Sequence, residues 1–130
     1  MKRETSIADI PGGAELVRWF GAAPSFHDAE VLALVLRRDE ASNLVVRHWR
    51  VTDRKDERGF YTIDRAFIAT FVFSGIDRLE LSGFSSQNVL NRLLIAVRPD
   101  GAGFDIELDD TYGIGGRIGC KALSVSYEPA

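Results

Sequence analysis

Cysteine and histidine, the residues that most often bind transition metals or act as nucleophiles and proton carriers, are scarce in this chain of 130 residues. Cys120 is the single cysteine, which excludes an intrachain disulfide and a cysteine-based zinc site. A reducing compartment, the cytoplasm, is therefore the expected location. The two histidines, His27 and His48, stand far apart in the sequence.

Long apolar runs are also missing. No stretch reaches the roughly 18 consecutive apolar residues that a membrane-spanning helix needs. The N-terminal segment, residues 1–6, reads Met-Lys-Arg-Glu-Thr-Ser and has no apolar core after its basic residues. We therefore expect neither a membrane span nor a secretory signal.

Positive charge is in short supply toward the end of the chain. The net charge is −3, and it is unevenly spread. Residues 37–65 carry eight Lys/Arg and six Asp/Glu, whereas residues 99–130 carry two Lys/Arg and six Asp/Glu. This balance argues against nucleic-acid binding through phosphates. The acidic final third is suited either to a basic partner or simply to solvent.

What the chain does have is alternation of apolar residues in a globular composition, with 45% apolar and 27% charged residues. Its length and composition predict a single domain over residues 1–130. In the stretch 65–84, one side of an extended chain would carry Phe67, Ala69, Phe71 and Phe73. The other side is apolar too, so this stretch is expected to be the centre of one antiparallel sheet, covered on both faces.

Further strands are predicted on both sides of this stretch. The pattern indicates strands at 26–37, 44–52, 92–98, 103–109 and 117–127, with a bulge near 121–122 in the last. Helix is the competing prediction at 26–37, because Ala and Leu favour it. Two hairpins are expected, joining 26–37 to 44–52 and 92–98 to 103–109.

The remaining segments predict loops and little helix. Residues 9–21 favour a short helix that begins at Asp9 and ends at Gly21, and one helical turn is expected near 86–91. Residues 53–60 are the most polar stretch and are expected to form an exposed loop. The fold class is thus α+β, mainly β: one twisted antiparallel sheet or a small sandwich of about six to eight strands.

One cluster has the composition of a chemical site. His27, Asp28 and Glu30 could bind a metal or exchange protons, provided that His48 comes alongside. Alternation along a strand would turn His27 away from the two acids. The alternative is structural: His27 or Asp28 ties the preceding turn to the strand through hydrogen bonds.

Two other motifs do not support catalysis. The glycines in 113–119 miss the spacing of a dinucleotide-binding loop, since Ile118 occupies the third glycine position, and a tight turn is expected instead. Ser85 and Ser86 lack the context of a nucleophile elbow. Cys120 lies among apolar neighbours and is expected to be buried.

An acidic ladder follows on the strand 103–109. Asp105, Glu107 and Asp109 would share one face, with Asp110 beyond them. Cations on neighbouring strands could neutralise them, namely Arg98, Arg117 and Lys121. Without that pairing, the four acids would form a surface for a basic protein partner, and they are the candidate partner-binding residues. A calcium site is the remaining alternative.

Three short motifs together resemble a known family. They are Phe-His-Asp-Ala-Glu-Val at 26–31, Gly-Phe-Ser-Ser-Gln-Asn-Val-Leu at 83–90 and Tyr-Gly-Ile-Gly-Gly-Arg-Ile-Gly-Cys at 112–120. In this order they are similar to the immunity protein 50 group of bacterial polymorphic-toxin systems, over about Trp19 to Val125. The resemblance implies a small cytoplasmic protein that binds and neutralises a toxin domain without catalysis. It also implies that the shared motifs maintain the fold.

The sequence thus leads to three hypotheses. The first is a protein-binding domain, an immunity protein that neutralises a toxin domain, with no enzymatic activity, cofactor, metal, nucleic acid or membrane partner. The second is a small ligand- or metal-binding domain or enzyme that uses His27, Asp28 and Glu30. The third is a structural module or homodimer in which an uncovered strand edge pairs with its twin, so that the chain is expected to be a monomer or a homodimer.

Overall fold

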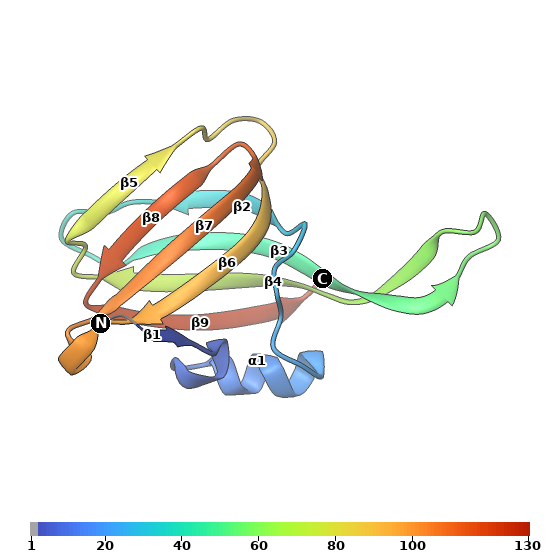
Figure 1. The fold of residues 1–130 in the computed structure, drawn as a ribbon, viewed down its shortest axis with the longest axis horizontal. Coiled ribbons are helices and arrows are strands. Elements are labelled where there is room, and N and C mark those ends of the chain that lie inside the picture. The colour runs from blue at the N-terminus through green and yellow to red at the C-terminus, as the bar shows by residue number, and fades with distance from the viewer. Residues whose placement is uncertain (1–2) are drawn as a thin grey trace.

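The structure, a computed structural model, describes residues 3–130. Residues 1 and 2 belong to the segment in which no secretory signal is predicted and lie outside the described residues. Over residues 3–130 the chain forms nine strands, one α-helix and two short 3-10 helices (Figure 1). In order they are β1 (Arg3–Thr5), η1 (Ile7–Asp9), α1 (Gly13–Phe20), β2 (Glu30–Val35), β3 (Ser42–Lys55), β4 (Tyr61–Ser74), β5 (Arg78–Ser82), β6 (Val89–Val97), η2 (Pro99–Gly101), β7 (Phe104–Tyr112), β8 (Gly115–Cys120) and β9 (Ala122–Pro129).

All strands belong to one antiparallel sheet in the order β5-β8-β7-β6-β2-β3-β4-β9, with β1 added to β6. The sheet has two halves, which we call the β7 half (β5, β8, β7 and β6) and the β3 half (β2, β3, β4 and β9). A single residue pair, Glu30 with Val89, joins β2 to β6. In Figure 1 the β7 half lies in front of the β3 half, so the sheet folds over on itself. The predicted mainly β, antiparallel class is confirmed.

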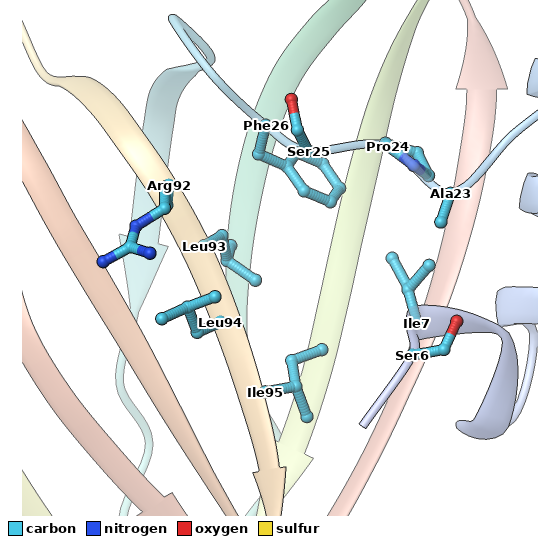
Figure 2. Close-up of a pocket in the computed structure, with 10 residues that line it drawn as sticks. All are labelled: Ser6, Ile7, Ala23, Pro24, Ser25, Phe26, Arg92, Leu93, Leu94 and Ile95. Atoms are coloured by element: carbon cyan, nitrogen blue, oxygen red, sulfur yellow. The ribbon is translucent and has the colours of Figure 1, made fainter. Parts of the chain in front are cut away.

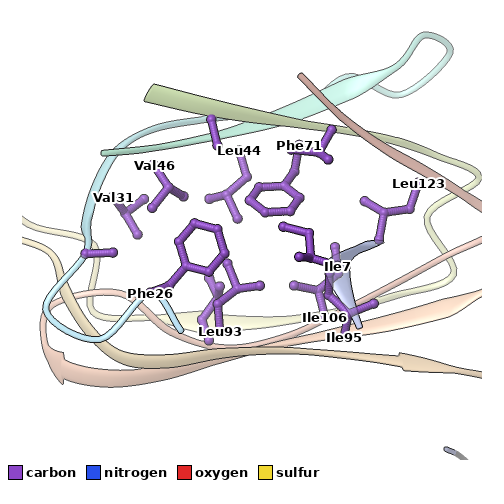
Figure 3. Close-up of a cluster of buried hydrophobic side chains, with 14 of the residues drawn as sticks. Ile7, Phe26, Val31, Leu44, Val46, Phe71, Leu93, Ile95, Ile106 and Leu123 are labelled. Carbon is purple, nitrogen blue, oxygen red and sulfur yellow. The ribbon is translucent and has the colours of Figure 1, made fainter. Parts of the chain in front are cut away.

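The hydrophobic core lies between the two halves. From β4, the predicted inward set of Phe67, Ala69, Phe71 and Phe73 is buried, as period-two alternation requires. Figure 3 shows the β3 half and the β7 half contributing side chains that face one another, with Phe71 on one side and Ile106 on the other. Burying each such large side chain contributes about 1.5–3 kcal/mol relative to exposure.

The predicted helix is present but shorter than 9–21. Asp9 does not cap it: its carboxylate accepts a hydrogen bond from the Ser6 amide (3.3 Å) at the start of η1. The helix ends as predicted, at Gly21, whose left-handed backbone (φ 93°) places its amide 2.9 Å from the Val17 carbonyl. Leu16 and Phe20 pack into the core, and Trp19 is half-buried against it.

The two hairpins, β2–β3 and β6–β7, are confirmed, but several element boundaries were wrong. The strand predicted from residue 26 begins only at Glu30, because Phe26 and Asp28 have left-handed backbones (φ 61° and 64°). The predicted loop 53–60 is reduced to residues 56–60, since β3 continues to Lys55. No helical turn lies at 86–91 in the described chain, where the Asn88 side chain binds the loop backbone instead.

The predicted centre of the sheet was also wrong. The stretch 65–84 is divided: β4 lies next to the edge strand β9, and β5 is the opposite edge. Similarly, the predicted bulge at 121–122 is a break at Lys121, where the chain passes from β8 in one half to β9 in the other. The second face of β4 is only partly covered, because Ile68 and Val72 keep an intermediate exposure.

Candidate protein-binding surface

The β3–β4 hairpin extends beyond the rest of the sheet. We call residues 49–65 the arm; it projects away from the body in Figure 1. β2 pairs with β3 only as far as Arg47, and β9 pairs with β4 only from Phe67 onward. Among the described residues, no strand therefore pairs with the outer edges of the arm. Such a two-stranded ribbon is marginally stable in water unless something packs against it.

The arm has one polar face, which is internally bonded. Arg50 and Asp64 lie opposite each other and form a bidentate ion pair at 2.7 and 2.8 Å. This hydrogen-bonded pairing lowers the pKa of the Asp64 carboxyl. Next along the same face, the hydroxyls of Thr52 and Thr62 share a hydrogen bond of 2.5 Å. These contacts hold the two strands in register without help from the core.

The other face of the arm is mainly apolar, and no other strand of the described chain packs on it; Lys55, which pairs with Tyr61, places its ammonium 5.2 Å from the centre of the Tyr61 ring. We give the name arm face to four exposed apolar residues of the arm: Val51 and Ile63, which pair directly across the strands, Tyr61, on the same side of β4 as Ile63, and Phe60, in the turn just before β4. Their exposed fractions are 61%, 50%, 57% and 65%. Apolar residues scattered singly over a surface are ordinary, but four gathered on one ribbon are typical of an interaction site.

The root of the arm is held in place by the C-terminal end of α1. The Arg65 guanidinium lies over the Trp19 ring, 5.4 Å from its centre, and Arg50 donates to the Phe20 carbonyl at 3.4 Å. Arg65 has a left-handed backbone (φ 50°) where the register with β3 shifts. These contacts fix the direction of the arm relative to the body.

The predicted His-Asp-Glu cluster is only partly assembled. His27, Asp28 and His48 line one pocket of about 270 Å³. His27 Nδ1 lies 3.1 Å from the Asn91 carbonyl oxygen, and its Nε2 lies 3.7 Å from the Asp28 carboxylate. Glu30 is placed elsewhere, 3.6 Å from Arg47. The described residues contain no group of three or more His, Cys, Asp and Glu side chains placed to hold a metal ion.

His48 is the buried member of this pocket, at 5% exposure. Its ring lies against those of Phe20, Phe26 and Phe67, with centroid distances of 5.3 to 5.9 Å. Burial lowers its pKa to about 4, an effect that the nearby Asp28 charge partly offsets. Its Nδ1 atom has no hydrogen-bond partner in the described structure. His48 is thus a neutral ring at physiological pH.

The predicted acidic ladder exists on β7, but cations meet most of it. Asp105, which is buried, lies 3.1 Å from Arg98; Glu107 lies 3.4 Å from Arg117; and Asp109 lies 3.2 Å from Arg92. Hydrogen bonds from the Asn91 amide and from Arg92 lower the pKa of Asp109.

Arg98 also binds Asp77, a carboxylate outside the ladder, at 2.6 and 2.7 Å. Lys121, predicted as a ladder partner, pairs with Asp77 instead, at 3.2 Å.

The three motifs behind the family resemblance meet at the junction of the two halves. The Asp28 amide donates to the Leu90 carbonyl (2.8 Å), and the Val31 amide donates to the Asn88 carbonyl (2.9 Å). The Asn88 side chain in turn accepts from the Ile114 amide (3.0 Å). Gly113 is required here, because its backbone is left-handed (φ 78°) and a Cβ atom would collide with the Gln87 carbonyl oxygen. The motifs therefore build the fold at this junction.

A groove of about 560 Å³ runs between β6 and the chain around Pro24 (Figure 2). Its walls are mostly apolar, and its three polar side chains are already used by the fold. Ser6 accepts from the Ala8 amide, Ser25 accepts from the His27 amide, and Arg92 pairs with Asp109. None of the predicted site residues lines this groove.

Sequence reasoning missed the arm, although a signal was present. Val51 and Ile63 continue the alternation of their strands on both sides of the polar stretch, which ends in Phe60 and is followed directly by Tyr61. Apolar residues so close to both ends of a loop predict that the two strands of the hairpin continue up to a short turn. The sequence did not show that nothing would cover them.

No helix among residues 3–130 has the length and apolar character needed to cross a membrane. Comparison with models of protein families gave no match. Comparisons with curated proteins and with solved structures likewise found no similar protein.

Proposed function

We propose that this chain is a protein-binding domain that docks a partner through the arm face, and that the partner is a toxin domain which the chain neutralises by contact. The observation that carries the binding proposal is the arm itself. It presents four exposed apolar side chains on a ribbon whose polar face is already bonded internally. The neutralising role rests on the resemblance of the three motifs to immunity proteins.

The charges of the arm favour an apolar cleft on the partner. The tip, residues 53–58, carries three cations (Arg54, Lys55 and Arg58) and three acids (Asp53, Asp56 and Glu57), all of them exposed. Because the signs balance, the tip does not favour a strongly charged partner. Binding energy would come instead from burying Val51, Tyr61 and related side chains, as in the apolar centre of known interfaces.

The experiment uses the full chain and a candidate toxin domain encoded beside it. Affinity is measured by calorimetry, and neutralisation by survival of cells that express the toxin. Val51→Glu and Ile63→Glu place a charge in the arm face and should weaken binding by about 100-fold or more, since an unpaired charge is costly in an apolar interface. Leu79→Glu on β5, where Leu79 is 44% exposed, is the matched control.

The acidic ladder supplies the competing surface. Glu107→Gln and Asp109→Asn should leave affinity nearly unchanged. If these variants abolish binding while the arm variants do not, the arm is not the docking element. If the wild-type chain neither binds nor protects against the toxin, the immunity function is wrong.

A second candidate function is ligand binding in the pocket of His27, Asp28 and His48. The buried Nδ1 of His48, which has no partner, favours it. A bound metal or ligand would perturb the His48 ring resonances in a titration followed by NMR. Addition of Zn²⁺, Ni²⁺ or Mn²⁺ without any change in those resonances would remove the metal-binding version.

A further inference from the structure

Two of the sheet edges are protected against pairing with other chains. β5 carries the charged pair Arg78 and Glu80, 3.1 Å apart. On β9, the Val125 amide is already bonded to the Pro11 carbonyl (2.9 Å), and the chain at Gly12 lies directly against the Val125 carbonyl. Charges and covering segments are the usual devices that keep strand edges from pairing.

The outer edge of β2 has neither device. Beyond the pair of Glu30 with Val89 and the hydrogen bond from the Val31 amide, no described residue pairs with this edge. Residues 32–35 read Leu-Ala-Leu-Val, with no charge and no proline. A bulge occurs at Leu32, but residues 33–35 keep regular register with β3. The free backbone N–H and C=O groups of such an edge can form hydrogen bonds with another extended strand.

Exposed apolar side chains gather along the same edge. Leu32, Val35 and Leu36 are 45%, 37% and 45% exposed, and Phe84 is 55% exposed. Leu32 and Phe84 line a groove of about 470 Å³ beside the edge. Residues 84–89 form the side of this groove opposite β2. The Asn88 side chain fixes their conformation through hydrogen bonds with the Ser85 amide (3.0 Å) and the Ser85 carbonyl (2.8 Å).

We infer that the chain forms a homodimer in which the two β2 edges pair antiparallel across a two-fold axis. The edge is suited to its own copy because it is uncharged, so like charges do not meet when the same patch faces itself. Pairing would join the β3 halves of both copies into one sheet and bury Leu32, Leu36 and Phe84. This inference goes beyond the proposed function and does not depend on it.

The dimer leaves the arm face open. The arm begins at Trp49, beyond Arg47, the last residue of β3 that pairs with β2. Each copy would therefore present its own arm, and a dimer could hold two partner molecules.

Sedimentation over a wide concentration range tests the inference, with two charge variants. Leu32→Glu/Leu36→Glu and Leu32→Lys/Leu36→Lys should each weaken self-association about tenfold or more, because like charges would meet across the axis. A mixture of the two variants should recover dimer. Leu79→Glu, equally exposed on β5, should associate like the wild type. Thermal unfolding of each variant verifies that it is folded.

Amide hydrogen exchange distinguishes strand pairing from contact between side chains alone. The amides of residues 33–35 should become more protected as concentration rises. A wild-type chain that stays monomeric at every concentration, or a mixture of charge variants that fails to associate, would overturn the inference. The same charge variants should still bind the toxin domain, so failure of the dimer and failure of the arm proposal give different results.

Discussion

The two halves of the sheet turn very different faces to the outside. On the β7 half, ion pairs join separate elements: Arg98, just after β6, pairs with Asp77, just before β5, and with Asp105 on β7, and Arg117 on β8 pairs with Glu107 on β7. On the β3 half, the outer face carries partly exposed apolar residues beside a single strand-to-strand ion pair among the described residues of the body, Glu30 with Arg47, and the arm face continues this surface beyond the body.

This difference changes how the acidic C-terminal third is interpreted. The net charge of a segment counts carboxylates, but Arg92 and Arg98 reach the ladder from β6 or its end. A carboxylate already paired within the fold has less to offer a basic partner, because breaking the pair offsets the gain. Apolar side chains form no ion pair that a partner must break, which favours the arm over the ladder as the docking element, although the Lys55 ammonium lies 5.2 Å from the centre of the Tyr61 ring.

The two halves should lose stability in different pH ranges as the solution is acidified. We expect the larger loss to come from His48 in the β3 half. His48 has its pKa lowered from 6.5 to about 4, so the unfolded chain binds more protons between these values. Its stabilising contribution is present above pH 6.5 and is lost as the pH falls toward 4, by about 3 kcal/mol. Denaturant unfolding at a series of pH values measures this loss.

The carboxylates of the β7 half should respond at lower pH. Ion pairing and hydrogen bonds lower the pKa values of Asp77 and Asp109 from 3.8, so their contribution is present above that pH and lost below it. His48→Phe should remove the loss between pH 6.5 and 4 and keep the one at lower pH. His27→Asn, at an exposed position, should keep both; if it removes the first, His48 is not its source.

A smaller effect is expected from breaking the ion pairs. Arg98→Met removes the cation shared by Asp77 and Asp105, whereas Arg92→Met removes a cation that contacts Asp109. Since the Arg98 side chain is 18% exposed and that of Arg92 is 58% exposed, Arg98→Met should lower Tm by several degrees more. Equal shifts in the two melting curves would show that the network adds nothing beyond single surface pairs.

The smallest effect on stability should come from the arm face. Ile63→Ala should change the free energy of unfolding by less than about 1 kcal/mol, because the side chain is half-exposed in the free protein. Ile106→Ala, the same change at a fully buried position, should cost about 2–5 kcal/mol and serves as the control. A large loss from Ile63→Ala would mean that the arm face is already covered in the isolated protein, for example by another copy.

Local sequence patterns predicted where the strands lie better than they predicted which strands pair with one another in the sheet. Alternation identified the inward residues of β4 and the hairpins, because a strand that faces a core on one side must alternate. It did not identify which strand lies next to which. The crossings near Gly75 and Lys121 depend on pairing partners distant in the sequence, and one apolar set fits several neighbours equally well.

The candidate sites divide in the same way. From the sequence, a site at His27 required His48 to lie beside it. In the fold both histidines line one pocket with Asp28, whereas Glu30 pairs with Arg47 outside it. The loop prediction at 53–60 missed the end of β3, because Asp53, Arg54 and Lys55 are all charged and so no alternation of apolar with polar residues marks these three positions.

The sequence by itself determined which side chains can face a core, since that follows from a backbone period of two residues. Only the tertiary structure decided which surfaces remain available. Whether a carboxylate meets an arginine, a strand edge meets a partner, or an apolar face is covered depends on residues brought together from far apart in the chain. For this reason the acidic ladder is largely paired, whereas the arm face and the β2 edge stay largely exposed within residues 3–130.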